Sequence, residues 1–157
     1  MDTVLKNSEA QGLPNIAVTP AQGKFLNLLV KATGAKRVLE VGTLGGYSTI
    51  WLARAIPEGG LVTTLELDHA KVATENTSNA RVADKVDLIV GPAAESVKKL
   101  GPNSSYDFAF IDADKEGNLL YFQEAKRLVK SGGTIIMSVV QVEAGFVVNL
   151  GSPVYSI

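Results

Sequence analysis

The stretch VLEVGTLGGYS, residues 38–48, joins an apolar, β-prone run to the beginning of a helical pattern. Its apolar part is typical of a strand that is buried on both faces of a sheet. Glycines at Gly42, Gly45 and Gly46 let the backbone approach a ligand closely, and the helix that follows offers free N–H groups at its N-terminus. A glycine-rich segment can also serve only as a tight turn. Its place between strand and helix nevertheless predicts a small-molecule site at the carboxyl edge of a parallel sheet.

Two common nucleotide-binding loops do not fit this spacing. A dinucleotide loop requires Gly-x-Gly-x-x-Gly. If Gly42 is the first glycine of that motif, Leu44 occupies the position of the second. A Walker loop requires Gly-Lys-Ser/Thr, which is absent, so a nucleotide-dependent oxidoreductase is disfavoured. Glu40 instead lies two residues before Gly42, where a carboxylate would meet the ammonium or amino-acid portion of a ligand.

Apolar runs rich in Val and Ile alternate with helical patterns along the rest of the chain, which is typical of βα units around a parallel sheet. The expected strands are Arg37–Val41, Gly60–Leu67, Val86–Val90, Tyr106–Ile111 and Thr134–Val140. A leading helix is expected between the Thr19-Pro20 cap and Gly34, followed by helices at Tyr47–Ala55, His69–Ala80, Pro92–Leu100 and Asn118–Lys130. We therefore expect an α/β fold, mostly parallel, with helices on both faces of the sheet. Phe146–Leu150 and Val154–Ile157 could add antiparallel edge strands or belong to an atypical tail.

Composition narrows the function classes. The chain has 157 residues, which suits a single domain over residues 1–157, and its net charge of -1 gives no field for nucleic acid or a membrane surface. There is no cysteine and only one histidine, His69, so a metal would need oxygen ligands. No signal peptide or membrane-spanning run is present, and a cytoplasmic location is expected by default. The glycosylation sequon at Asn76 is then expected to be a chance occurrence.

Acidic residues follow two of the expected strands at the same edge of the sheet. Glu66 ends the second strand, where it could accept hydrogen bonds from ribose hydroxyls or be a solvated strand end. Asp112, Asp114 and Lys115 follow the fourth strand, and such charges after an apolar run suit a site better than a core. Lys115 could alternatively be a surface lysine that pairs with a neighbouring acid.

Several stretches occur in a fixed order around the quoted one: LPNIAVTPAQGKFL before it, then TLELD, VGPAAESV and YDFAFIDADK after it. With VLEVGTLGGYSTIWLA they resemble the S-adenosylmethionine-dependent O-methyltransferases of the catechol and caffeoyl-coenzyme A type, over residues 13–136. The resemblance implies a Rossmann-like methyltransferase fold with a seven-stranded sheet, an O-methyltransferase activity on a small phenolic or catechol-like acceptor, and a homodimer.

The resemblance also assigns roles to individual residues. The implied cofactor contacts are Val18, Glu40, Gly42, Thr43, Ser48, Glu66, Ala93 and Asp112. Asp112 would also bind a divalent cation, Mg²⁺ or Ca²⁺, while Lys115 would deprotonate the acceptor hydroxyl and Asp114 would contact the substrate. A metal beside the hydroxyl would lower its pKa and so help Lys115 to take the proton.

The chain departs from the family pattern at the end of its fifth strand. The family has Asp-Asn there, which supplies two metal ligands, whereas this chain has Ser138 and Val139. Asp112, Ser138 and waters would hold Mg²⁺ only weakly, so metal dependence is in question. The chain is also shorter than a typical member, so the C-terminal strands are expected to be truncated or altered. We therefore keep a second hypothesis, an S-adenosylmethionine-binding module with impaired or no catalysis.

Overall fold

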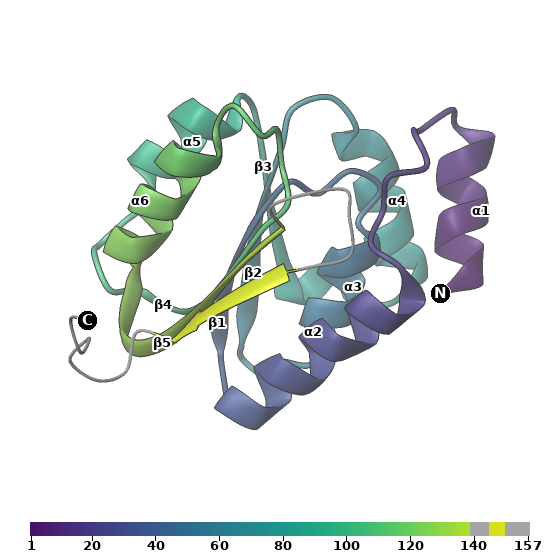
Figure 1. The fold of residues 1–157 in the computed structure, drawn as a ribbon. Coiled ribbons are helices and arrows are strands. Elements are labelled where there is room, and N and C mark those ends of the chain that lie inside the picture. The colour runs from purple at the N-terminus through teal and green to yellow at the C-terminus, as the bar shows by residue number, and fades with distance from the viewer. Residues whose placement is uncertain (139–144, 150–157) are drawn as a thin grey trace.

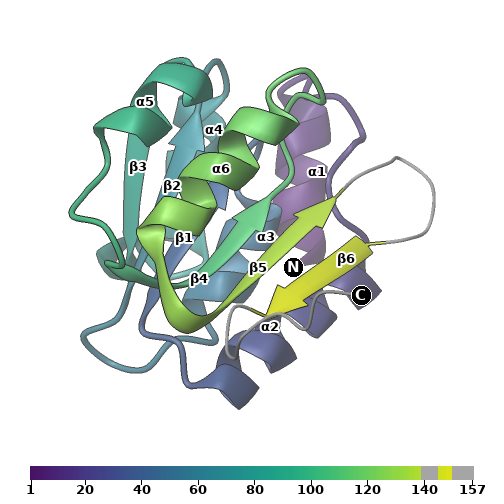
Figure 2. The same ribbon diagram turned by 60° about the vertical axis from the view of Figure 1, so that its left-hand side comes forward.

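A single mixed sheet forms the centre of the computed structural model, which describes residues 1–138 and 145–149. The strands are β1 Arg37–Val41, β2 Leu61–Glu66, β3 Val86–Val90, β4 Tyr106–Ile111, β5 Val129–Ser138 and β6 Gly145–Asn149. They lie side by side in the order β3-β2-β1-β4-β5-β6, and the strand order reverses beside β1. The first five strands are parallel, whereas β6 pairs antiparallel with β5 at the edge (Figure 2).

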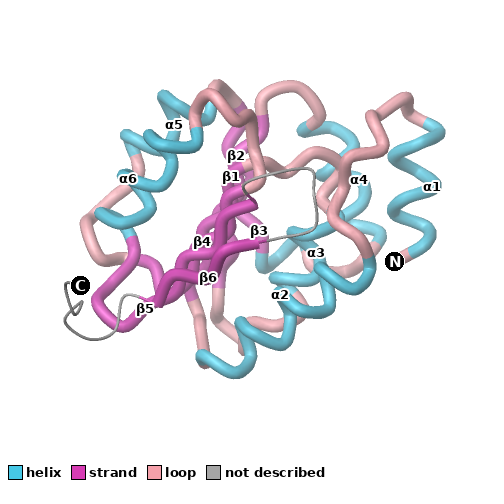
Figure 3. Tube along the Cα trace, in the orientation of Figure 1, coloured by secondary structure: helices cyan, strands magenta, loops and turns pink. Residues whose placement is uncertain are grey.

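Helices cover both faces of this sheet (Figures 1 and 3). They are α1 Asp2–Ala10, α2 Pro20–Thr33, α3 Tyr47–Ala53, α4 Ala70–Asn79, α5 Ala93–Lys99 and α6 Asn118–Leu128. The helices α5 and α6 lie on one face, and α2, α3 and α4 lie on the other, with α1 packed outside α4. The three-layer, Rossmann-like architecture expected from the sequence is confirmed.

Alternating side chains of the central strands supply a separate core on each face. Val38 of β1 and Phe108 of β4 point to the side of α2 and α3, whereas Leu39 and Ile111 point to the side of α5 and α6. All four are fully buried. Each such side chain contributes roughly 1.5–3 kcal/mol when it leaves water, so the sheet is held from both sides. The carboxyl ends of β1 and β4 are thereby fixed next to each other.

Local chemistry sets the ends of α2. The Thr19 hydroxyl accepts a hydrogen bond from the backbone N–H of Gln22, and the Gln22 side chain accepts one from the Thr19 N–H, which forms a capping box. Pro20 fits the first helical position because its missing N–H has no partner there. Gly34 ends the helix in the left-handed conformation, where glycine has no steric penalty.

Most of the expected elements are present, and the differences lie at element ends. The expected antiparallel edge strand is confirmed at Gly145–Asn149, whereas the second β-prone run, residues 154–157, lies outside the described residues. The expected end of the last helix at Lys130 is wrong: α6 stops at Leu128, and β5 already begins at Val129. The buried, β-branched Val129 pairs with Tyr106, and that tertiary pairing outweighs the continuing helical pattern.

The sequence pattern missed α1. Of its residues only Val4 is buried, so no apolar stripe marks it as a helix. The seventh strand that the family resemblance implies is not among the six strands of the described residues. No helix in residues 1–138 is long and apolar enough to cross a membrane.

Candidate functional site

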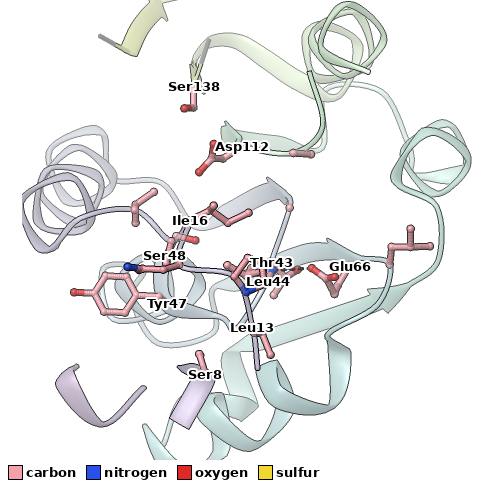
Figure 4. Close-up of a pocket in the computed structure, with 18 of the residues that line it drawn as sticks. Ser8, Leu13, Ile16, Thr43, Leu44, Tyr47, Ser48, Glu66, Asp112 and Ser138 are labelled. Atoms are coloured by element: carbon pink, nitrogen blue, oxygen red, sulfur yellow. Dashed lines mark hydrogen bonds between the residues drawn. The ribbon is translucent and has the colours of Figure 1, made fainter. Parts of the chain in front are cut away.

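A cavity of about 610 Å³ opens at the carboxyl edge of the sheet, a size that suits a small-molecule ligand. Its wall combines residues that are far apart in the sequence (Figure 4). Residues 42–46, which we call the glycine loop, form the base next to the start of α3, and residues 112–115 form the opposite side. Residues 13–18 run across the front. A cavity thus lies at the sheet edge where the sequence predicts a small-molecule site.

Gly42 brings the two sides of the cavity together. Its φ angle of +98° is one that side chains rarely adopt, and a Cβ atom at this position would overlap the carbonyl oxygen of Asp112. The backbone N–H of Asp112 donates to the carbonyl of Val41 at 2.9 Å, which extends the β1–β4 pairing to this point. The loops after β1 and β4 can meet here only because residue 42 is glycine.

Glu66 is buried beside the glycine loop rather than solvated, with 8% of its surface exposed. One carboxylate oxygen accepts from the backbone N–H of Leu44 at 2.6 Å, and the other accepts from Asp68 and His69 at 3.0 and 3.1 Å. A carboxylate has about four acceptor positions, so these three bonds leave capacity for a ligand hydroxyl. Glu66 lines the cavity, as Figure 4 shows, and is well placed for this role.

Glu40 occupies a different position from the one expected. It does not line the cavity, but lies fully buried beneath it, on the α3 side of β1. Its Oε2 contacts the hydroxyls of Thr49 and Thr64 at 2.5 and 2.6 Å, whereas its Oε1 has no hydrogen-bond partner. Ser48, which does line the cavity, stands close enough to lower the pKa of Glu40. Glu40 would therefore interact with a ligand in the cavity indirectly, through Ser48.

The hydrogen bonds around Glu40 fit a protonated carboxyl. The Thr43 hydroxyl contacts both the Thr64 hydroxyl, at 2.6 Å, and the carbonyl of Leu65, at 3.0 Å. With the two contacts to Glu40, this makes four hydrogen bonds for three hydroxyl hydrogens. A proton on Oε2 supplies the fourth, because Glu40 can then donate to Thr64, Thr64 to Thr43, and Thr43 to Leu65.

The electrostatics of Glu40 agree with this count. Burial raises the pKa of its carboxyl from 4.5 to about 7, because the charged form loses its hydration. Neighbouring hydroxyls oppose the rise, and the negative charge of Asp112 adds to it. Glu40 therefore binds its proton more tightly than an ordinary glutamate does.

Asp112 and Ser138 face each other across the upper part of the cavity (Figure 4). Partial burial raises the pKa of Asp112, and the Ser138 hydroxyl opposes that shift. Among the described residues, no group of three or more His, Cys, Asp or Glu side chains could hold a metal ion. One carboxylate and one hydroxyl are a poor donor set for Mg²⁺, which takes six oxygen ligands, so the residues described here do not fit the implied metal.

The Asp114 carboxylate accepts hydrogen bonds from its own turn and from α6. One oxygen accepts from the backbone N–H of Gly117 at 2.8 Å and the other from the hydroxyl of Tyr121 at 2.6 Å. Burial, with Asp114 as a second cause, raises the pKa of Tyr121 well above its usual range, so Tyr121 remains a donor. Gly117 is needed because a Cβ there would overlap the Tyr121 ring. Asp114 thus shapes the turn that carries Lys115, and a direct contact with substrate stays a prediction.

Lys115 lines the cavity from an exposed position on that turn. Among residues 1–138 its amine forms no salt bridge, so pairing with Asp114 or Glu116 does not account for it. The hydrogen bonds of Asp114 hold the turn that carries Lys115, whereas the Lys115 amine is free to reach a bound molecule. Val18 and Ala93, two further expected contacts, also lie on the wall.

The structure adds several residues that the sequence analysis did not single out. Ser8, Leu13 and Ile16 come from α1 and the segment after it, and Figure 4 shows Ile16 over the middle of the cavity. Ile16 has 56% of its surface exposed and lines the cavity, so it offers an apolar side chain to a bound molecule. The available sequence signal was the stretch LPNIAVTPAQGKFL, which contains Leu13 and Ile16 and contributes to the family resemblance.

Comparisons with known proteins agree with this geometry. The family model described as O-methyltransferase matches residues 1–154. A catechol O-methyltransferase of Mycobacterium tuberculosis is 51% identical over 135 residues, which are 85% of this chain and 61% of that protein. One of Niastella koreensis is 46% identical over 135 residues, 83% of this chain and 61% of that protein. The chain thus spans about three fifths of these relatives.

Solved structures show the same fold. An O-methyltransferase from Bacillus cereus, solved in complex with SAH, has a TM-score of 0.84 and 46% identity, over 87% of this chain and 64% of that one. One from Streptomyces achromogenes, solved in complex with SAM, has a TM-score of 0.81 and 35% identity, over 87% and 63%. The implied methyltransferase fold is therefore confirmed.

The position of Gly42 predicts a large loss of stability for Gly42→Ala. The added Cβ meets backbone as well as an unfavourable φ, so we expect a cost of about 3 kcal/mol or more in the free energy of unfolding, measured by urea denaturation. Gly59→Ala is the matched control, because Gly59 also has a positive φ, of +74°, but has no atom within 4 Å of its Cβ position. It should cost about 1 kcal/mol. Equal losses would contradict the close approach at Gly42.

The raised pKa of Glu40 predicts a pH-dependent stability. A carboxyl that binds its proton more tightly in the folded state loses stability as pH rises from its unfolded value, 4.5, to its folded value, about 7. The wild type should lose about 3 kcal/mol over that range relative to Glu40→Gln, in urea denaturation at a series of pH values. The exposed Glu58, changed to Gln, should leave the profile unchanged. Parallel profiles for wild type and Glu40→Gln would show that Glu40 is charged throughout.

Proposed function

Because this chain belongs to the O-methyltransferase family, we propose that it binds S-adenosylmethionine in the cavity and transfers its methyl group to a hydroxyl oxygen of a small acceptor. The observation that carries the proposal is that Glu66, beside the glycine loop, lines the same cavity as Asp112 and Lys115 on the opposite side. The chain spans 61% of the M. tuberculosis relative, so this proposal concerns the part of the catalytic unit that the chain contains.

The electrostatics of the cavity support this cofactor. Its charged lining residues are Glu9, Glu66, Asp112, Asp114 and Lys115, so carboxylates prevail. S-adenosylmethionine carries a sulfonium and an ammonium group, which such a wall attracts, and ribose hydroxyls can donate to the remaining acceptor position of Glu66. Solved relatives from B. cereus and S. achromogenes hold SAH and SAM, respectively.

The ammonium group of the cofactor also gives a role to Glu40, which is buried below Ser48. A cation placed on this side of the cavity lowers the pKa of nearby carboxyls, because it favours their charged forms. Asp112 lines this region, and the unpartnered Oε1 of Glu40 lies beneath it. Glu40 would then attract the ammonium group electrostatically from behind Ser48 and Asp112, without touching it.

Methyl transfer requires alignment of the acceptor and removal of its proton. When bound, S-adenosylmethionine supplies a methyl group on positively charged sulfur, so that a carbon–oxygen bond forms as the carbon–sulfur bond breaks and S-adenosylhomocysteine leaves. The amine of Lys115, in its neutral form, takes the proton of the acceptor hydroxyl. Asp114 and Tyr121 hold the backbone turn that sets the reach of this amine. Because the described residues do not fit a divalent cation, no step here is assigned to one.

A small phenolic or catechol-like molecule is the acceptor class that we propose. Relatives named catechol O-methyltransferase are 51% and 46% identical, and a caffeoyl-CoA O-methyltransferase of Eucalyptus globulus is 38% identical over 77% of this chain. The exposed side chain of Ile16 over the cavity would pack against a flat aromatic ring. The proposal therefore combines an apolar contact on one side with a base on the other.

Calorimetric titration with S-adenosylhomocysteine tests the cofactor part of the proposal. We expect binding by the wild type and an affinity at least about tenfold weaker for Glu66→Gln, which keeps the shape but weakens acceptance from ribose hydroxyls. Glu58→Gln, at an exposed site away from the cavity, should bind like the wild type. Absence of binding by the wild type would contradict the proposed cofactor.

Transfer of labelled methyl from S-adenosylmethionine to catechol tests the reaction. Lys115→Ala should lower kcat about 100-fold or more while S-adenosylhomocysteine affinity is retained, because only proton removal is affected. Lys126→Ala, which removes an exposed lysine of α6, is the control. Chelation with EDTA should leave the rate within about twofold, given the poor metal donor set. Cofactor binding without any methylated product would favour a binding module with no catalysis.

A further inference from the structure

Asn76 of α4 is a buried polar residue behind the cavity that the proposed reaction does not use. Only 2% of its surface is exposed, although its side chain is an amide. Its Nδ2 donates to the carbonyl of Gly45 at 2.8 Å and to the hydroxyl of Ser8 at 3.3 Å, and its Oδ1 accepts from Nδ2 of Asn7 at 2.8 Å. Both amide hydrogens and the carbonyl oxygen are thus in use, which such a buried amide requires.

These hydrogen bonds join three separate parts of the chain. Gly45 belongs to the glycine loop, whereas Asn7 and Ser8 belong to α1, which Figure 1 shows beside α4. We call residues 2–18, which comprise α1 and the segment that crosses the cavity, the N-terminal cover. Asn76 is therefore the point at which the cover and the glycine loop are held by one side chain.

The packing at Gly45 shows that the two parts also fit each other sterically. A Cβ at Gly45 would overlap the Ser8 hydroxyl and come within 3.2 Å of the Leu13 side chain. Ser8 donates its own hydrogen to the carbonyl of Val4 at 2.9 Å, so it is free to accept from Asn76. Ser8, Leu13 and Gly45 all line the cavity. Any shift of the cover relative to the loop would change the cavity wall.

A second connection between α1 and α4 lies further from the cavity. Gln11 donates to Glu75 at 2.6 Å, but this contact is exposed, so it contributes little. The Asn76 side chain is only 2% exposed, so loss of its partners would leave buried polar groups unsatisfied. The coupling between cover and loop therefore depends mainly on Asn76.

We propose that Asn76 is a positioning residue that couples the N-terminal cover to the glycine loop, so that cofactor binding and closure of the cover stabilise each other. The inference rests on the proposed function for the identity of the ligand. A molecule that fixes the glycine loop also fixes the Gly45 carbonyl, which is the acceptor that orients Asn76 toward α1. By thermodynamic reciprocity, a cover held in place by Asn76 must favour the ligand-bound loop by the same factor.

In the sequence, Asn76 stands out only as part of a glycosylation sequon. Its burial and hydrogen bonds leave no room for a glycan in the folded protein. They also explain why an asparagine occupies this position in α4, where Leu or Val would leave Gly45, Ser8 and Asn7 without their partner.

The test combines calorimetry with hydrogen exchange of residues 2–18, each with and without S-adenosylhomocysteine. In the wild type, the ligand should slow exchange in the N-terminal cover. Asn76→Asp keeps the shape but replaces two donors with an acceptor that faces the Gly45 carbonyl; it should weaken binding about tenfold and remove the ligand's effect on the cover. Asn79→Asp makes the same change at an exposed position of α4 and should behave like the wild type.

A second variant covers the case in which Asn76→Asp does not fold. Asn7→Ala removes the bond between α1 and Oδ1 of Asn76, together with a long, exposed hydrogen bond from Gln11 within the same segment. It should raise the dissociation constant about threefold and accelerate exchange in residues 2–18. A merely structural role would lower the unfolding midpoint yet leave the ligand-dependent protection of the cover intact. That outcome, with normal affinity, would overturn the inference. A wild type that does not bind S-adenosylhomocysteine would instead overturn the proposed function, and the coupling with it.

Discussion

The contact between the loop after β1 and the loop after β4, at Gly42 and the carbonyl of Asp112, is the constraint on which the site depends. Buried side chains on both faces fix β1 beside β4, and the missing Cβ of Gly42 lets their loops touch. This contact places Asp112 and the following turn opposite the glycine loop. A cavity at the point where the strand order reverses then follows from the topology.

Two glutamates at this edge show how burial separates the roles of identical side chains. Glu66 receives backbone N–H groups at both oxygens and keeps acceptor capacity toward the cavity. Glu40 is surrounded by hydroxyls in the core, where a proton completes the hydrogen bonds and burial raises its pKa to about 7. Glu66 is suited to contact a ligand directly. Glu40 is suited to lose its proton when a positively charged group binds in the cavity above it.

Much of the fold could be predicted because the relevant signals are local. The buried strands are mostly apolar and β-prone in sequence, and the Thr19 cap and Gly34 mark the ends of a helix. The end of α6 and the presence of α1 could not be predicted, since Val129 pairs with a strand distant in the sequence and α1 buries only Val4. Tertiary contacts decide both cases.

The candidate site divides in the same way. Glu66 ends β2, and Asp112 and Lys115 lie just after β4, so their convergence on one edge could be predicted. The hydrogen bonds of Asp114 and the bridge at Asn76 instead depend on contacts between helices and loops. A crystal structure of the chain grown with S-adenosylhomocysteine is the decisive measurement for the proposed site. We expect the ribose at Glu66 and the amino-acid end between Ser48 and Asp112, beneath residues 13–18. A nucleoside bound elsewhere, or an empty cavity at saturating ligand, would contradict it.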